Sequence, residues 1–396
     1  MSQLLRKVAL PIALGLLSGC STVDGVMDTA GGWVSGSSAD SVPKLEPLQA
    51  ELHPTIQWSE TIGEGTSGLI VRLIPQLVDG PLGVTLYSAA VDGTVSAIAL
   101  PSGKERWHVE YSERIMSGVV VDSHNLYFGS ESGQLVALDR ESGEERWSLS
   151  LLSEILAPVA VAGERVVVRT VDGKISAVNR LSGEKLWHYE REVPVLTLRG
   201  TGSPVIVGQQ VIVGLDSGEV VALSLEGGRE QWLKSVTSAR GRTEIERMVD
   251  IDADPVVKED MVYVVGYQGE LAALSRTDGA LRWKRKVSGV TAPMVYGPYL
   301  FLTDQEGNVW AFDRKDGSAL WKQDSLVERG PTTPLLMDKS LVIADSTGYL
   351  HWISAEDGHL QGRIKLDSAG ISAPPLKFGN AVVSYGNSGK LALITD

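Results

Sequence analysis

The stretch GQLVALDRESGEERW, Gly133 to Trp147, contains an apolar run between two glycine turns and ends in a tryptophan. Forty residues later the chain repeats this pattern as GKISAVNRLSGEKLW, Gly173 to Trp187. Aligned on its first glycine, the pattern occurs eight times at intervals of 38 to 51 residues, at Gly93, Gly133, Gly173, Gly218, Gly269, Gly307, Gly348 and Gly389. A period near 40 residues is typical of a repeat architecture.

Each repeat predicts four short strands. In the fourth repeat they are SPVIVG, QVIVGLDSG, EVVALSLEGG and REQWLKSV, bounded by Gly, Asp and Ser turns. These segments are apolar almost continuously, so the sheet that they form must be covered on both faces. Four-stranded antiparallel units that cover one another and repeat eight times predict an all-β fold, an eight-bladed β-propeller.

The two ends of the propeller predict how the ring closes. The eighth repeat stops at Asp396 after its third strand. The missing strand is present near the other end as TIQWSETI, Thr55 to Ile62. We therefore expect a propeller domain over residues 55–396, in which the N-terminal strand completes the last blade.

A tryptophan stands at the same place on the outermost predicted strand of seven blades. A catalytic residue would not be copied around a ring, whereas a residue wedged between adjacent sheets would be. We expect these indoles to pack between blades, and Gly362, which takes the place in the seventh repeat, to mark a looser joint. The seven residues are Trp58, Trp107, Trp147, Trp187, Trp232, Trp283 and Trp321.

The N-terminus reads as an export signal. Arg6 and Lys7 precede the apolar run VALPIALGLL, which is too short to span a bilayer, and a small-residue exit follows. We expect residues 1–19 to be a signal peptide. LSGC resembles the lipobox of bacterial lipoproteins, which implies that Cys20, the only cysteine of the chain, is acylated.

A flexible tether is expected after the lipid anchor, over residues 20–54, because GGWVSGSSAD is rich in Gly and Ser and lacks periodicity. Ser21 is not the aspartate that usually retains such lipoproteins at the inner membrane. The resemblance therefore implies the outer membrane.

Charge and composition exclude several function classes. The net charge of −13 argues against nucleic acid as a partner, because phosphate binding needs a basic surface. The sequence shows no nucleophile–base pair, no zinc-ligand spacing and no phosphate-binding loop. We expect no catalytic residue, no metal and no cofactor.

Insertions in a repeat protein often mark its binding face. The three longest links between blades are Ser59–Asp92, His188–Ser217 and Leu233–Gln268, and the last two are consecutive. In the second, Leu196 and Leu198 would lie on one side of an extended backbone with Arg199 beside them. The leucines suit a binding surface and the top of the core equally well.

The third long link contains MVDIDADP, Met248 to Pro255, in which three aspartates alternate. An extended backbone would place Asp250, Asp252 and Asp254 on one side. A solvated strand edge and a binding surface both fit this pattern, whereas a calcium site would lack the usual Asp/Gly loop.

The repeat G-x-[apolar]-x-A-[apolar]-x-x-x-[SD]-G-x-x-x-W resembles the pyrroloquinoline-quinone (PQQ) type of propeller repeat, and the signatures of WD40 repeats do not recur. Within that group, PQQ-dependent periplasmic dehydrogenases are the alternative identification. Many of them have a disulfide between neighbouring cysteines, which this chain lacks. The whole chain, including VLTLRGTGSP and MVDIDADP, is more similar to the BamB family of outer-membrane protein assembly lipoproteins.

This resemblance implies a non-catalytic scaffold, lipid-anchored at the periplasmic face of the outer membrane. Its partners would be BamA, bound through the periplasmic POTRA domains, the rest of the BAM complex, and unfolded outer-membrane proteins. Residues at five positions are associated with BamA binding in the family, and the sequence matches at Leu196, Leu198, Arg199, Asp250 and Asp252. We expect these five side chains to form one exposed patch.

Overall fold

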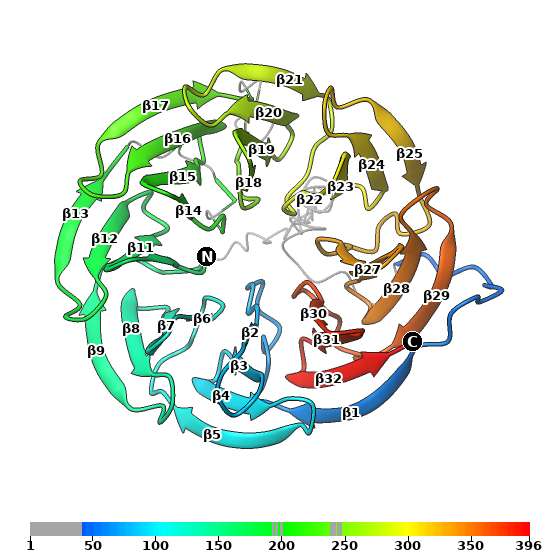
Figure 1. Cartoon of the computed structure of the whole chain (residues 1–396), viewed down its shortest axis with the longest axis horizontal. Coiled ribbons are helices and arrows are strands. Elements are labelled where there is room, and N and C mark those ends of the chain that lie inside the picture. The colour runs from blue at the N-terminus through cyan, green and yellow to red at the C-terminus, as the bar shows by residue number, and fades with distance from the viewer. Residues whose placement is uncertain (1–41, 192–193, 195–196, 199–200, 238–242, 244–247) are drawn as a thin grey trace, which may run out of the picture. The chain divides into compact units, whose positions relative to one another are not determined.

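The computed structural model describes residues 42–191, 194, 197–198, 201–237, 243 and 248–396. All regular structure in this part of the chain is β-strand, and the strands form eight four-stranded antiparallel sheets arranged as a ring (Figure 1). The predicted eight-bladed propeller is confirmed. Over the described ranges, no helix reaches the length and apolar character needed to cross a membrane.

Blades are numbered one to eight in chain order, and each contains four strands from the centre of the ring outward. The strands are β2 (Gln76–Val78), β3 (Thr85–Ala89), β4 (Thr94–Ala99), β5 (Lys104–Glu110); β6 (Val120–Val121), β7 (Asn125–Gly129), β8 (Gln134–Asp139), β9 (Glu145–Ser150); β10 (Ala160–Ala162), β11 (Arg165–Arg169), β12 (Ile175–Asn179), β13 (Lys185–Tyr189); β14 (Val205–Val207), β15 (Gln210–Gly214), β16 (Glu219–Ser224), β17 (Glu230–Ser235); β18 (Val256–Lys258), β19 (Met261–Val265), β20 (Leu271–Ser275), β21 (Leu281–Arg285); β22 (Met294–Tyr296), β23 (Tyr299–Thr303), β24 (Val309–Asp313), β25 (Ala319–Gln323); β26 (Leu335–Met337), β27 (Ser340–Ala344), β28 (Tyr349–Ser354), β29 (Leu360–Lys365); and β30 (Leu376–Phe378), β31 (Ala381–Tyr385), β32 (Lys390–Thr395), β1 (Thr55–Thr61).

The ring closes as the sequence predicts. β1 pairs antiparallel with β32, from Thr55 opposite Thr395 to Thr61 opposite Lys390. The eighth blade therefore takes three strands from the C-terminal end of the chain and its outermost strand from the N-terminal side (Figure 1). Neither terminal strand of the propeller can dissociate without breaking the hydrogen bonds of this sheet.

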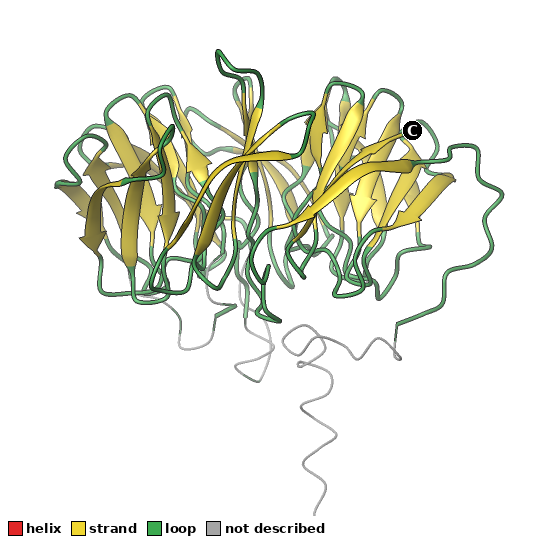
Figure 2. Cartoon of the chain, turned by 90° about the horizontal axis from the view of Figure 1, so that it is seen from below, coloured by secondary structure: helices red, strands yellow, loops and turns green. Residues whose placement is uncertain are grey.

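The connections of the propeller gather on two faces, because neighbouring antiparallel strands run in opposite directions (Figure 2). One face carries the turn between the second and third strands of every blade, together with the connections from the outermost strand of each blade to the innermost strand of the next. We call this the link face. The described parts of the three long links that connect β1 with β2, β13 with β14 and β17 with β18 lie on it, whereas the other turns lie on the opposite face.

The core lies between the blades. The second and third strands of most blades are buried along almost their whole length, as in NLYFG of β7 and QLVALD of β8. Such strands cannot alternate apolar and polar residues, because each face of a blade packs against a neighbouring sheet. The continuous apolar runs in the sequence have this cause.

The tryptophan prediction is confirmed in detail. At all seven positions the indole N–H donates to a backbone carbonyl of the next blade, at 2.5 to 3.2 Å. The indole also lies on the second-turn glycine of that blade, where an added Cβ would come within 2.5 to 3.0 Å of the ring. These glycines have φ between 65° and 82°, which a residue with a Cβ adopts only with strain. The repeated glycine and the repeated tryptophan are thus the two halves of one joint.

The expectation that Gly362 marks a loose joint is wrong. Trp352 of β28 stands opposite Gly362, at the position where β4, β8, β12, β16, β20 and β24 have alanine, and it is buried. A Cβ on Gly362 would meet the carbonyl oxygen of Leu52 at 2.7 Å. Leu52 packs into the core cluster between blades seven and eight. An indole from the neighbouring strand and a leucine from the N-terminal segment replace the missing tryptophan.

The segment 42–54, which the sequence analysis assigned to the tether, lies in contact with blade seven. The amides of Glu51 and Leu52 donate to the carbonyl of Gln361, and the Arg363 guanidinium donates to the carbonyl of Glu46 at 2.9 Å. Arg329 binds the carbonyl of Pro43 at 2.6 Å. Residues 42–396 form one compact unit, and Cys20 lies outside the described residues.

Candidate functional site

The site is built on the segment that precedes β18 in blade five. Its apolar residues, Val249, Ile251 and Ala253, are buried, and Ile251 and Ala253 belong to the core clusters on the two sides of the blade. Alternation along an extended backbone then turns the intervening aspartates to the other side. The prediction that Asp250, Asp252 and Asp254 share one side is confirmed by their common binding partner.

That partner is the preceding long link. The backbone amide of Leu198 donates to Asp250, that of Thr201 donates to Asp252 at 3.1 Å, and that of Ser203 donates to Asp254 at 2.7 Å. The two links therefore lie side by side on the link face. We call residues 197–203 the carboxylate-bound segment; of these, residues 197, 198 and 201–203 are described.

Close approach of the two backbones is possible at Gly202. A Cβ at this position would lie 3.0 Å from the carbonyl oxygen of Asp252. A glycine at that point lets the carboxylate-bound segment approach the acidic segment closely enough for aspartate side chains to reach its amides.

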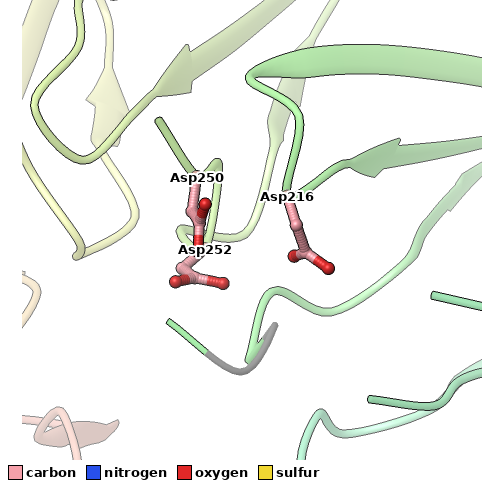
Figure 3. A group of neighbouring side chains, drawn as sticks. All are labelled: Asp216, Asp250 and Asp252. Atoms are coloured by element: carbon pink, nitrogen blue, oxygen red, sulfur yellow. The ribbon is translucent and has the colours of Figure 1, made fainter. Parts of the chain in front are cut away.

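A further carboxylate, from blade four, lies close to those of Asp250 and Asp252. Asp216 follows β15 in the turn toward β16, and its side chain faces Asp250 and Asp252 (Figure 3). One oxygen or more of each of the three carboxylates lies within 4.8 Å of the others. Arg169, the last residue of β11 in blade three, makes a buried ion pair with Asp216.

Burial of like charges perturbs the titration of these groups. Burial raises the pKa of Asp250 to about 7, and the nearby charges of Asp252 and Asp216 act in the same direction. Burial also raises the pKa of Asp252 to about 6, against the charge of Arg169, which favours the ionised form. The arrangement therefore holds more negative charge than one arginine neutralises, and it takes up a proton near neutral pH.

The three carboxylates are the donor set that a hard cation such as calcium prefers. Here the guanidinium of Arg169 already supplies a positive charge to Asp216, while Asp250 and Asp252 each hold a backbone amide. The chemistry that these groups perform with the residues present is structural: Asp250 and Asp252 bind and position the carboxylate-bound segment, and Asp216 pairs with Arg169.

A second, half-buried contact connects this site with the opposite side of the ring. Arg72 lies in the first long link, before β2 of blade one, and binds both oxygens of Asp254 at 3.1 Å. It also donates to the carbonyl of Thr201 at 3.4 Å. Blades one and five face each other across the ring (Figure 1), so this side chain bridges the centre.

The five predicted partner-binding residues do not all lie on the surface. Asp250 and Asp252 are 0% and 4% exposed, so the expectation that they form part of an exposed patch is wrong. Leu198 is half-buried and in contact with Asp250 through its amide. Leu196 and Arg199 lie outside the described residues.

Sequence reasoning missed Arg169, Asp216 and Arg72. No local pattern identifies Asp216 and Arg72, because each is a single charged residue in a loop. A signal was present at Arg169, where a charge ends the apolar run RVVVR of β11. A charged residue at the buried end of a strand indicates a buried partner of opposite charge.

The replacement Asp250→Asn tests the electrostatics of the site. The folded-state pKa of Asp250 lies above the usual 3.8, so between pH 4 and 7 the folded protein binds more protons than the unfolded chain. Its stability therefore falls as pH rises through this window. Asparagine keeps an acceptor for the Leu198 amide and removes the charge. We expect Asp250→Asn to unfold at a higher temperature than the parent protein at pH 8, and at a similar temperature at pH 5.

The matched control is Asp79→Asn, which removes an exposed charge from the opposite face. It should leave the pH dependence of the thermal midpoint unchanged. A pH dependence in Asp250→Asn as steep as that of the control would contradict the raised pKa.

The family model described as outer membrane protein assembly factor BamB matches residues 91–323. The outer membrane protein assembly factor BamB of Pseudomonas aeruginosa is 43% identical over 367 residues, which cover 91% of this chain and 96% of that protein.

Solved structures agree with this relationship. The crystal structure of BamB from Moraxella catarrhalis superposes with a TM-score of 0.78 at 25% identity, covering 87% of this chain and all of that one. A quinohemoprotein alcohol dehydrogenase from Comamonas testosteroni reaches a TM-score of 0.69 at 14% identity, covering 86% of this chain and 76% of that one, a likeness that shows the fold alone. The chain belongs to the BamB family of outer membrane protein assembly factors.

Proposed function

We propose that the chain is a non-catalytic scaffold of the outer-membrane β-barrel assembly machinery, held at the periplasmic face of the outer membrane by a lipid on Cys20. It docks on the POTRA domains of BamA through Leu196, Leu198 and Arg199, and thereby helps to present unfolded outer-membrane proteins for insertion. Membership of the BamB family supports the role in assembly.

One observation carries the proposed docking site: three alternating aspartates of one link each accept a hydrogen bond from a backbone amide of the neighbouring link, at Leu198, Thr201 and Ser203. Such hydrogen bonds fix the backbone of a loop, and most strongly at Asp250 and Asp252, where a broken bond would leave a buried carboxyl oxygen without its backbone donor. A loop fixed in this way loses little conformational entropy when it binds.

The five residues that the family resemblance singles out then have two roles. Asp250 and Asp252 position the loop from beneath without touching a partner, since they are buried. Leu196, Leu198 and Arg199 supply the contacts. Two leucines and an arginine fit the apolar centre and charged rim of a modest interface.

Unfolded barrel proteins are the proposed clients. The outermost strand of each blade ends its sheet, and an extended chain could pair with such an edge by β-augmentation. At blade seven the N-terminal segment already binds beside this strand, through the carbonyl of Gln361.

The test is co-purification of BamA with a Leu196→Ser, Arg199→Ala double variant from detergent-solubilised envelopes. We expect BamA to be lost from the purified complex while the thermal melt of the propeller stays unchanged. Leu152→Ser is the matched control, because Leu152 is 90% exposed in another link of the same face. Recovery of BamA with the double variant at the level of the parent protein would rule out the assigned contacts.

A further inference from the structure

The first long link, between β1 and β2, is held firmly but leaves two apolar side chains in solvent. Val71 and Leu73 are buried in the largest core cluster, and the amide of Ile62 and that of Thr66 bind carbonyls of blade eight. Between these anchors Leu69 and Ile70 are 38% and 62% exposed. An exposed apolar pair on an otherwise anchored link is a common feature of binding surfaces.

Arg72 joins this link to the carboxylate-bound segment. Its guanidinium binds both oxygens of Asp254 and the carbonyl of Thr201. One oxygen of Asp254 also accepts the amide of Ser203 at 2.7 Å. A single carboxylate thus holds the two links together, and a bidentate arginine pair fixes their relative orientation as well as their distance.

The two apolar elements are close enough to share one interface. A path through the contact of Arg72 with Thr201 connects Ile70 to Leu198. It runs two residues along the chain from Ile70 to Arg72, across the arginine side chain to the carbonyl of Thr201, and three residues along the chain from Thr201 to Leu198. The five residues span at most about 17 Å when fully extended, and the Arg72 side chain with its 3.4 Å hydrogen bond adds to this distance. A standard protein interface covers about 800 Å² on each partner, a disc about 30 Å across, which is wide enough to include both elements.

The contacts proposed above are too few for such an interface by themselves. Leu196, Leu198 and Arg199 belong to one short segment, whereas a stable interface takes about 20–30 residues from each side. The additional area has to come from neighbouring surface of the link face. The first long link is the neighbour that Arg72 fastens to the segment.

We propose that Leu69 and Ile70 form a second apolar contact of the docking surface and bind the same periplasmic domain of the partner as Leu198. This inference rests on the proposed function. It assigns the first long link to recognition and makes Arg72 a positioning residue that holds the two halves of the surface in register.

The experiment is a titration of the purified POTRA fragment of BamA with the detergent-solubilised chain and three variants: Leu69→Ser with Ile70→Ser, Leu196→Ser with Arg199→Ala, and Leu152→Ser as control. We expect the Leu69/Ile70 variant to bind at least about tenfold more weakly than the parent protein, with an unchanged thermal melt. The control should bind like the parent protein.

The outcomes separate the two proposals. If the Leu196/Arg199 variant loses binding and the Leu69/Ile70 variant does not, the inference is overturned and the proposed function stands. If the parent protein does not bind the fragment, both are overturned. If light scattering shows instead that the parent protein forms dimers and the Leu69/Ile70 variant does not, the apolar pair binds a second copy of this chain, which also overturns the inference.

Discussion

Arg169→Met is expected to destabilise the propeller by about 3–5 kcal/mol, the usual cost of removing one partner from a buried ion pair. Arg169 is 2% exposed and supplies the positive charge beside Asp216, Asp250 and Asp252. Methionine fills much of the same volume but leaves these carboxylates to repel one another. Against a total folding free energy of about 5–15 kcal/mol, the loss should be plain in urea denaturation.

The effect of Arg169→Met should depend on pH. The raised pKa values of Asp250 and Asp252, about 7 and 6, rise further without the arginine charge, so both groups are protonated in the folded variant at pH 5.5. Protonation removes the repulsion that the arginine relieves in the parent protein. We therefore expect a larger loss at pH 8 than at pH 5.5.

The double variant Arg169→Met, Asp216→Asn is the matched control. It removes a positive and a negative charge together, and should regain a large part of the stability at pH 8, because a buried pair is replaced by neutral side chains. An Arg169→Met variant as stable as the parent protein at pH 8 would show that the arginine does not compensate the carboxylates.

The ring, its closure and the joints between blades could be predicted, because the residues that form them recur in the repeats or stand at a fixed position relative to them. Gly143 and Trp107, which are in contact, belong to consecutive repeats. Both residues recur in most repeats, and this recurrence indicates that they pack against each other. The closing strand could be recognised since Trp58 carries the same mark. Repetition makes a long-range contact visible as a local pattern.

The sequence also contains the two substitutions that distinguish the joint between blades seven and eight. The residue that is alanine in six third strands is Trp352 in β28, and the tryptophan of the fourth strand is Gly362. Both changes fall on one cross-strand pair, whose side chains share a face. What the sequence does not reveal is Leu52, because no repeat places the N-terminal segment against that pair.

The burial of Asp250 and Asp252 could not be predicted from their alternation. A row of aspartates fits a solvated edge as well as a row of amide acceptors, and only the neighbouring backbone decides between them. That backbone comes from another link, about 50 residues earlier, and the charges of Arg169 and Arg72 come from two further blades. Single contacts between distant residues leave no periodic trace.

Trp232→Ala is expected to cost about 3–5 kcal/mol, as for other deletions of buried aromatic side chains. Trp232 joins blade four to blade five and belongs to the core cluster between them. Its ring lies on Gly279, and its N–H donates to the carbonyl of Arg276 at 2.8 Å. Alanine would leave a cavity between two sheets that their own hydrogen bonds keep from closing. The free energy of unfolding, measured by urea denaturation, provides the test.

Two further variants separate the contributions to the joint. Trp232→Phe keeps an aromatic ring on Gly279 but loses the donor to Arg276, so it should cost more than the hydrogen bond alone, about 1 kcal/mol, and less than the alanine variant. Leu52→Ala removes the smaller, half-buried wedge of the joint that has no outer tryptophan, and should cost about 1–2 kcal/mol. If Leu52→Ala proved as damaging as Trp232→Ala, the N-terminal segment would be an integral part of the ring. If Trp232→Ala cost less than 1 kcal/mol, the joints would owe their strength to the strands themselves.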